Sequence, residues 1–156
     1  MSIIRRRWLL ASAFVAALAL VAVAVWWINQ RSTISVRLGE TTFAAWVADD
    51  DAERIKGLSG VTSLSDTQAM LFDLQRQERW GIWMKDMKLP IDIIWLDRDK
   101  TVVYIVEQAP AELGTQKTYK PPVPARYVLE VRAGAVADYG VRLGDSAQFN
   151  LRGATR

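Results

Sequence analysis

The sequence contains no cysteine and no histidine among its 156 residues. No disulfide can form, so a folded domain must be held together by burial of apolar side chains. Cysteine and histidine nucleophiles, a histidine general base and the usual Cys/His zinc sites are excluded as well. A lipoprotein is excluded because there is no cysteine to acylate. Any catalysis would depend on Asp, Glu, Lys, Tyr, Ser or Thr, and we expect no metal and no cofactor.

The sequence also has little net charge outside its first residues. Of the 20 Lys and Arg, Arg5, Arg6 and Arg7 precede residue 29, which leaves 17 to balance the 17 Asp and Glu of residues 29–156. A nucleic-acid interface would need Lys and Arg concentrated in a patch or stripe. We therefore expect no nucleic-acid partner.

Residues 1–28 have the pattern of a membrane segment. The three arginines precede an apolar run over residues 8–28, broken only by Ser12. As a helix this run is about 30 Å long, the thickness of the hydrocarbon core of a bilayer. Positive residues stay on the cytoplasmic side. The pattern predicts a single-pass signal anchor in the cytoplasmic (inner) membrane, with the C-terminal domain outside the cytoplasm.

A cleavable signal peptide is the alternative interpretation of the same segment. Ala22-Val23-Ala24 has the small-x-small form of a cleavage site, but it lies inside the apolar run. Trp26 and Trp27 follow it and fit an aromatic belt at the membrane surface. We therefore favour retention as an anchor over export after cleavage. The expected organisation is an anchor at 1–28, a linker at 29–32, a β domain at 33–151 and a tail at 152–156.

The stretch from residue 79 to residue 106 is the centre of the predicted domain. Residues 79–85 alternate, so that Trp80 and Met84 share one face with Ile82 while Trp83 and Lys85 share the other, which indicates a half-buried strand. Residues 91–96 and 101–106 are apolar on nearly both faces, and Asp97-Arg98-Asp99-Lys100 between them favours a turn. This pattern predicts a central hairpin buried from both sides.

The other predicted elements are short. A capping box of Asp50 and Glu53 starts a helix of about two turns that ends at Gly57, and this explanation of the acidic run is favoured over a calcium site because EF-hand spacing is absent. Arg54 is expected to be a surface or tethering ion-pair residue and not a catalytic one. The remaining expected elements are strands at 33–38, 42–48, 69–74, 125–132 and 146–151, loops at 61–67 and 108–123, and a second helix at 133–139. Many short strands predict a mainly β fold, a compact β-sandwich or partly closed barrel with two short helices.

Several motifs occur in a characteristic order. They are Ala52-Glu53-Arg54 with Gly57-Leu58, Trp83-Met84-Lys85-Asp86, Leu89-Pro90-Ile91-Asp92-Ile93-Ile94, Asp97-x-Asp99, Val102-Val103, Pro124-Ala125-Arg126-Tyr127-Val128-Leu129-Glu130-Val131, Ala133-Gly134 and Gly144-Asp145. This series resembles the prokaryotic family called domain of unknown function 192 over roughly residues 33–151. The resemblance implies a compact β-sandwich-like fold and no known activity. The family pattern has Asn-Thr at Asp86-Met87 and Gly at Lys100.

The candidate ligand-binding residues are Trp83, Lys85, Asp92, Arg126 and Tyr127. Tryptophan offers a flat apolar face and Asp or Lys offers directional hydrogen bonds, a combination suited to a sugar or a peptide of the cell envelope. The competing interpretation is that Trp80, Trp83 and Trp95 are core residues and that Asp92 is a paired structural carboxylate. We favour core for each tryptophan.

Two classes of function stay open on the sequence alone. The favoured one is a non-catalytic binding or accessory module of the envelope, with an envelope glycan or protein as partner. The alternative is a hydrolase acting on an envelope glycan, with Asp86 and Asp92 as weak catalytic candidates, because glycosidases use a pair of carboxylates. Such a pair needs carboxyl groups about 5 to 9.5 Å apart across an open cleft.

Overall fold

A computed structural model of the chain describes residues 33–111 and 117–151. The chain divides into two units, residues 1–31 and 32–156. The predicted anchor at 1–28 lies outside the described residues. Within the ranges that are described, no helix is long and apolar enough to cross a membrane. The elements are β1 (Thr33–Leu38), β2 (Thr41–Ala48), α2 (Asp51–Lys56), β3 (Gln68–Glu78), β4 (Ile82–Trp83), β5 (Ile91–Leu96), β6 (Val102–Ala109), β7 (Thr118–Tyr119), β8 (Ala125–Arg132) and α3 (Ala135–Asp138).

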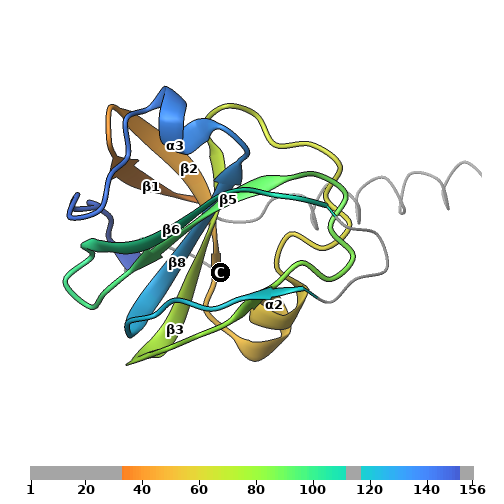
Figure 1. Cartoon of the computed structure of the whole chain (residues 1–156), viewed down its shortest axis with the longest axis horizontal. Coiled ribbons are helices and arrows are strands. Elements are labelled where there is room, and N and C mark those ends of the chain that lie inside the picture. The colour runs from red at the N-terminus through yellow and green to blue at the C-terminus, as the bar shows by residue number, and fades with distance from the viewer. Residues whose placement is uncertain (1–32, 112–116, 152–156) are drawn as a thin grey trace, which may run out of the picture. The chain divides into compact units, whose positions relative to one another are not determined.

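The domain is built on one open six-stranded sheet in the order β1-β2-β3-β8-β5-β6 (Figure 1). All neighbouring strands are antiparallel except β2 and β3. A separate two-stranded ribbon pairs β4 with β7. The prediction of a mainly β fold with two short helices is confirmed. The partly closed barrel is not: β1 and β6 form the two edges of the sheet and do not pair.

Each face of the sheet carries its own apolar core. One cluster includes Val36, Phe43 and Leu129 and is covered by α3 through Ala135 and Val136. The other includes Phe72, Ile93 and Trp95 and lies under Ile82 of β4 and Tyr119 of β7. We call these the α3 face and the ribbon face. The helices α3 and α2 lie on opposite sides of the sheet in Figure 1.

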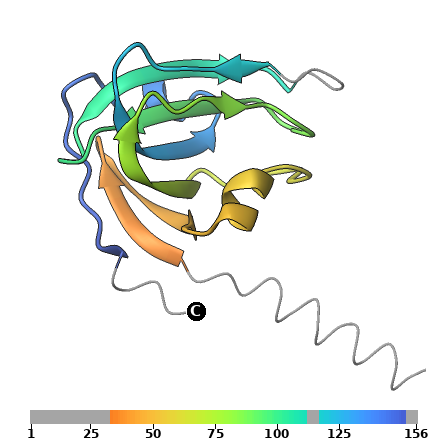
Figure 2. The same ribbon diagram turned by 90° about the horizontal axis from the view of Figure 1, so that it is seen from below.

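The parallel pair β2 and β3 requires a crossover connection, and α2 is part of it. Asp50 is the N-cap, and its carboxylate accepts a hydrogen bond from the Glu53 amide at 2.8 Å. The Glu53 carboxylate accepts a hydrogen bond from the amide of Asp49 at 3.3 Å. In a standard capping box this second bond comes from the amide of the N-cap residue, here Asp50, so the predicted capping box forms with the donor shifted by one residue. Gly57 ends the helix at φ 47°, and a Cβ there would lie 3.2 Å from the Phe72 ring. In Figure 2, α2 (yellow) directly follows β2 (orange) along the chain.

Three predicted strands differ from the structure. In the stretch 79–85 only Ile82 and Trp83 form a strand, although the expected alternation of buried and exposed side chains is present from Ile82 to Lys85. β5 is buried on both faces, but β6 is an edge strand and only half-buried, so the hairpin is not central. Residues 146–151 form no strand, because Ser146 and Gln148 make only isolated bridges.

Candidate functional site

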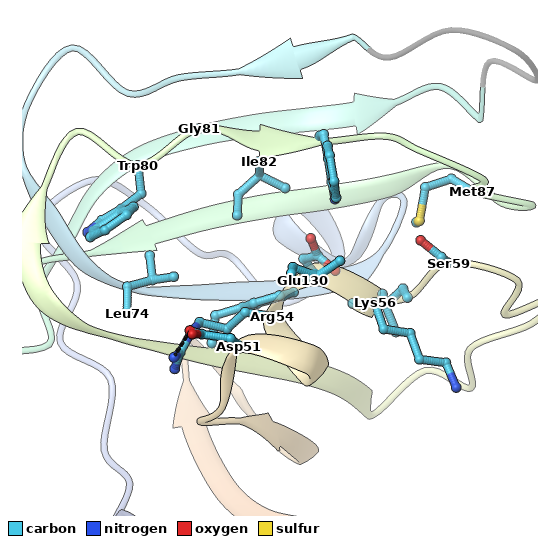
Figure 3. A pocket seen from close by; sticks show the side chains of 15 residues that line it. Asp51, Arg54, Lys56, Ser59, Leu74, Trp80, Gly81, Ile82, Met87 and Glu130 are labelled. Carbon is cyan, nitrogen blue, oxygen red and sulfur yellow. Dashed lines mark hydrogen bonds and ion pairs between the residues drawn. The ribbon is translucent and has the colours of Figure 1, made fainter.

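A pocket of about 320 Å³ opens on the ribbon face, between α2 and the segment that carries β4 (Figure 3). Its side walls come from α2 with the turn after it, from β3, and from residues 80–83. The two strands of the ribbon pack closely here, because a Cβ on Gly81, just before β4, would lie 2.7 Å from the methyl group of Thr118 on β7. Most of the lining is apolar and includes Leu58, Phe72 and Ile82. Pockets of this size and character accept small ligands.

Glu130 is the deeply buried polar side chain of the pocket. It lies on β8 between Met70 of β3 and Ile93 of β5 in register, on the same face as Val128. The residue is 4% exposed, and its Oε2 atom has no hydrogen-bond partner among the residues that the structure describes. Burial raises the pKa of the Glu130 carboxyl to about 8. Figure 3 shows Glu130 in the middle of the lining, between Trp80 and Leu74 on one side and Ser59 and Met87 on the other.

The charged residues at the rim of the pocket are already paired or exposed. Arg54 donates to the backbone carbonyls of Asp49 and Asp73 at 2.6 and 2.9 Å, and it forms an ion pair with Asp51 at 2.7 Å. These contacts confirm the expected tethering role of Arg54, which joins α2 to β3. Lys56 is exposed. None of these groups contributes to the raised pKa of Glu130, which has burial as its cause.

The three tryptophans of the central stretch have different environments. Trp95 is fully buried in the core of the ribbon face, and its indole N–H donates to the Trp80 carbonyl. Trp80 is half-buried and lines the pocket, and its indole N–H donates to the Arg76 carbonyl at 2.8 Å. Trp83 is 39% exposed and also lines the pocket. The core prediction therefore holds for Trp95 alone.

Lys85 and Asp86 lie beside the pocket and do not line it. The Lys85 ammonium stands 5.4 Å from the centroid of the Trp83 ring, a cation–π contact at an exposed position. Asp86 is exposed and has a left-handed backbone with φ 56°. Its carbonyl accepts from the Gly60 amide, which ties this loop to the turn after α2.

Asp92 lies on the other face of the sheet. It is fully buried, and its two carboxylate oxygens accept from the amides of Gln108 and Val136 at 2.8 and 2.9 Å. The first amide belongs to a bulge of β6 opposite Asp92, where the register of the strand pair shifts. The second is in the first turn of α3, whose N-cap Gly134 has no side chain to cap it. The structure does not bring Asp92 together with Trp83, Lys85 or Asp86.

Arg126 and Tyr127 also lie away from the pocket. Arg126 contacts Asp73 at 3.4 Å and covers the Tyr127 ring at 4.9 Å, and its hydrogen bond to Asp73 raises the pKa of the guanidinium. Tyr127 is buried in the core of the α3 face, with its ring edge-to-face against Phe149. Burial raises the pKa of the Tyr127 hydroxyl. Of the five predicted ligand-binding residues, only Trp83 lines the pocket.

A cluster of three carboxylates lies at the start of α2. Oxygens of Asp49, Asp50 and Glu53 lie within 4.8 Å of one another. Asp50 and Glu53 both accept backbone hydrogen bonds in capping the helix. These bonds confirm that the acidic run caps α2.

Sequence reasoning did not single out Glu130 as a site residue. The available signal was the strand 125–132, in which Glu130 has the same parity as Val128 and is flanked by Leu129 and Val131. A glutamate in the middle of a strand that is buried on both faces is unusual unless it is paired. The position of Glu130 on the same strand face as Val128 could have indicated a buried carboxyl, but not that its Oε2 atom would lack a partner among the described residues.

Comparisons with known proteins agree with this architecture. A crystal structure from Sinorhizobium meliloti 1021, described as a "putative transcription regulator", is 29% identical, with a TM-score of 0.71 over 76% of this chain and 95% of that one. A protein of unknown function from Novosphingobium aromaticivorans DSM 12444 is also 29% identical, with a TM-score of 0.68 over 74% of this chain and 84% of that one. No curated protein matches the sequence. The model of the uncharacterised family DUF192 ("Uncharacterized ACR") matches residues 33–149, so the chain belongs to the family called domain of unknown function 192.

Proposed function

We propose that this protein is a non-catalytic binding module, tethered to the cytoplasmic membrane by residues 1–28, that binds a small and largely apolar ligand outside the cytoplasm. The observation that carries the proposal is the apolar pocket lined by Glu130, whose Oε2 atom has no partner within the described part of the chain. A buried polar atom without a partner costs about 1 to 3 kcal/mol. A ligand that supplies the missing hydrogen bond removes this cost, so the pocket is more stable occupied than free.

The mouth of the pocket supports the same conclusion. Four large apolar side chains are exposed among the described residues, and two of them, Ile55 at 61% and Trp83 at 39%, line this pocket. Exposed apolar groups beside an apolar cavity are typical of binding sites. An apolar ligand would cover both side chains as it enters, which adds to the free energy of binding.

The geometry favours binding over hydrolysis. Two-carboxylate hydrolysis needs a second carboxyl across the cleft from the first. Asp92 lies on the opposite face with both oxygens engaged, and Asp86 does not line the pocket. Asp51, the other carboxylate of the lining, is exposed and paired with Arg54. Glu130 therefore has no carboxylate positioned as its catalytic partner among the residues that line the pocket.

The lining also favours one kind of envelope ligand. An envelope glycan or protein is the partner expected from the sequence, but a sugar presents several hydroxyl groups, each of which needs a hydrogen bond when buried. The pocket offers one deeply buried polar side chain. A small apolar molecule, or an apolar group of a larger envelope partner, fits this lining better than a glycan.

The membrane part of the proposal rests on the sequence of residues 1–28, with export after cleavage as the alternative. The Sinorhizobium protein is described as a "putative transcription regulator", but the balanced charge of residues 29–156 gives no support for a DNA-binding role in this chain.

The intact mass of protein extracted from membranes distinguishes a retained anchor from export after cleavage. A mass that includes Met1 to Ile28 supports the tether, and a species that begins near Val25 rules it out.

The binding part is tested on the full chain in lipid nanodiscs, with its seven tryptophans replaced by 5-fluorotryptophan. The probes are naphthalenes that share one ring system and differ in one substituent. Saturable shifts of the fluorine signals of Trp80 and Trp83 support the pocket. The Trp80 shift should need more probe to saturate in Trp83→Ala, and both shifts should be unchanged in Leu143→Ala. Leu143 is the control because it is exposed and apolar but does not line the pocket. Absence of saturable shifts with every probe would refute the binding proposal.

A further inference from the structure

We infer, on the basis of the proposed binding function, that the ligand is an uncharged molecule with a ring-sized apolar body and one terminal group that both donates and accepts hydrogen bonds. A hydroxyl or a primary carboxamide is such a group, and it would pair with the Glu130 carboxyl. The inference rests on where the polar and apolar atoms of the lining lie.

The body of the ligand follows from the walls of the pocket. Phe72, Trp80 and Trp83 contribute three aromatic side chains to the lining, and its other large apolar side chains are aliphatic or Met87. Aromatic rings pack favourably against one another and against flat apolar groups. A volume of about 320 Å³ is at the small end for ligand pockets, so one or two fused rings fit better than a long flexible chain.

The terminal group follows from the position of Glu130. Asp51 and Lys56 are exposed, and Arg54 and Ser59 are half-buried, so these polar side chains lie toward the rim. Glu130 alone carries its polar atoms to the buried part of the lining. A ligand with one polar group at its inner end can therefore satisfy Glu130 and be satisfied by it.

A charged ligand fits less well. An ammonium brings three N–H donors and a full charge into a place where one carboxyl is the deeply buried acceptor, and a buried ion pair needs further hydrogen bonds to offset desolvation. A carboxylate ligand would place a second acid against Glu130. An uncharged group avoids both costs.

The protonation state of Glu130 agrees with this choice. Because burial raises its pKa to about 8, the carboxyl is mostly protonated at pH 7. A protonated carboxyl has one O–H donor and one carbonyl acceptor side by side. A primary carboxamide presents the complementary acceptor and donor, and a hydroxyl can take either role.

The test uses five probes with the same ring system: 2-naphthalenemethanol, 2-naphthaleneacetamide, 2-naphthylmethylamine, 2-naphthoate and 2-methylnaphthalene. Each is titrated at pH 7 into the full chain in nanodiscs, with empty nanodiscs to subtract partition into lipid. We expect the alcohol and the amide to bind at least about tenfold more tightly than the other three, the effect of one satisfied buried hydrogen bond.

Two variants identify Glu130 as the partner. Glu130→Gln keeps a donor and an acceptor without a charge, so the alcohol and the amide should bind within about threefold of wild type. Glu130→Leu removes both, so their affinity should fall by about tenfold while that of 2-methylnaphthalene is kept. Glu107→Gln is the matched control, because Glu107 is exposed on β6.

Three results would overturn the inference while leaving the binding function in place. One is tightest binding of the amine together with its loss in Glu130→Gln, which would show an ion pair. Another is equal affinity for 2-methylnaphthalene and the alcohol, which would show that Glu130 makes no hydrogen bond to the ligand. The third is loss of alcohol and amide binding in Glu130→Gln. Failure of all five probes to bind would instead refute the proposed function.

Discussion

The sheet of this domain buries one carboxyl group on each of its faces, and the two have opposite surroundings. Asp92 on β5 points to the α3 face, where two backbone amides donate to it. Glu130 on β8 points to the ribbon face, where no residue of the described ranges 33–111 and 117–151 is a partner of its Oε2 atom. The two residues are close in the sheet, because Asp92 pairs with Val131 and Ile93 pairs with Glu130. Both are buried, Asp92 at 0% and Glu130 at 4% exposure, so the two carboxyls differ in their hydrogen-bond donors and not in burial.

This difference distinguishes a structural acid from a candidate ligand-binding acid. The donors of Asp92 come from a bulge of β6 and from the first turn of α3, two backbone groups that would otherwise be unsatisfied. Asp92 thus joins the edge of the sheet to a helix. Glu130 is flanked by the apolar residues Met70 and Ile93, and no described residue of the ribbon face forms a hydrogen bond with its Oε2 atom. A partner from outside the chain is the simplest way to do so.

The largest expected effect is the contribution of Glu130 to the pH dependence of stability. The pKa of Glu130 is about 8 in the folded protein against 4.5 for a free glutamate, so the folded state binds its proton more tightly. The stabilisation is complete below about pH 4.5 and is lost as the pH rises through 8. Wild type should lose up to about 5 kcal/mol relative to Glu130→Gln between these limits. Urea melts from pH 5 to pH 9 measure this loss.

The exposed Glu107→Gln should show no such difference from wild type. Equal pH slopes in wild type and Glu130→Gln would mean that Glu130 is solvated or paired in solution. The contrast between the two faces would then disappear.

The next largest effect compares two tryptophans on the ribbon face. Trp95→Ala empties a fully buried site and should cost about 3 to 5 kcal/mol of unfolding free energy. Trp83→Ala removes a side chain that is 39% exposed and should cost about 1 to 2 kcal/mol. Denaturant midpoints of both variants measure the gap. A cost for Trp83→Ala as large as that for Trp95→Ala would make Trp83 a core residue and remove it from the site.

A smaller loss is expected on the α3 face. Asp92→Asn keeps the shape of the side chain, but its NH₂ group meets one of the two backbone donors, so one amide loses its acceptor. The variant should lose about 2 to 4 kcal/mol of stability. Asp86→Asn is the control, because Asp86 is exposed and its φ of 56° suits asparagine at least as well as aspartate. A neutral Asp92→Asn would show that the two hydrogen bonds of Asp92 do not hold α3 and the bulge in place.

Most of the secondary structure could be predicted from the sequence, because local patterns determine it. The alternation in β1, the capping residues of α2 and the apolar runs of β5 and β8 all depend on neighbouring residues. The family pattern is explained in the same local terms. Where this chain has Asp86 and Lys100, the family pattern has Asn and Gly. Both positions have a positive φ, 56° and 65°, a conformation that Asn and Gly adopt readily, so these departures concern backbone conformation.

The site depends on contacts that no local pattern encodes. The parallel pairing of β2 with β3 places α2 over the ribbon face, and the β4–β7 ribbon joins residues that are far apart in the sequence. Both are needed to enclose the pocket around Glu130. Asp92 is separated from Trp83 because its strand neighbours Ile91 and Ile93 point to the ribbon face, so Asp92 points to the α3 face. The sequence could suggest acids and tryptophans as candidates, but not which of them meet.

The smallest expected effect concerns α2, which forms one wall of the pocket on the ribbon face. Asp50 caps α2 by accepting from the Glu53 amide, and Asp50→Ala should cost about 1 kcal/mol of stability. Because α2 carries Arg54 and Ile55 into the lining, fraying of its first turn should also weaken binding of 2-naphthalenemethanol by a few fold.

The control lies on the α3 face, where the N-cap Gly134 has no side-chain hydrogen bond to lose. Gly134→Ala therefore tests backbone strain at φ 86° and leaves the pocket intact. Measuring stability and probe affinity for both variants separates the faces: Asp50→Ala should lower both quantities and Gly134→Ala only stability. An unchanged affinity in Asp50→Ala would show that the pocket does not depend on the N-terminal turn of α2.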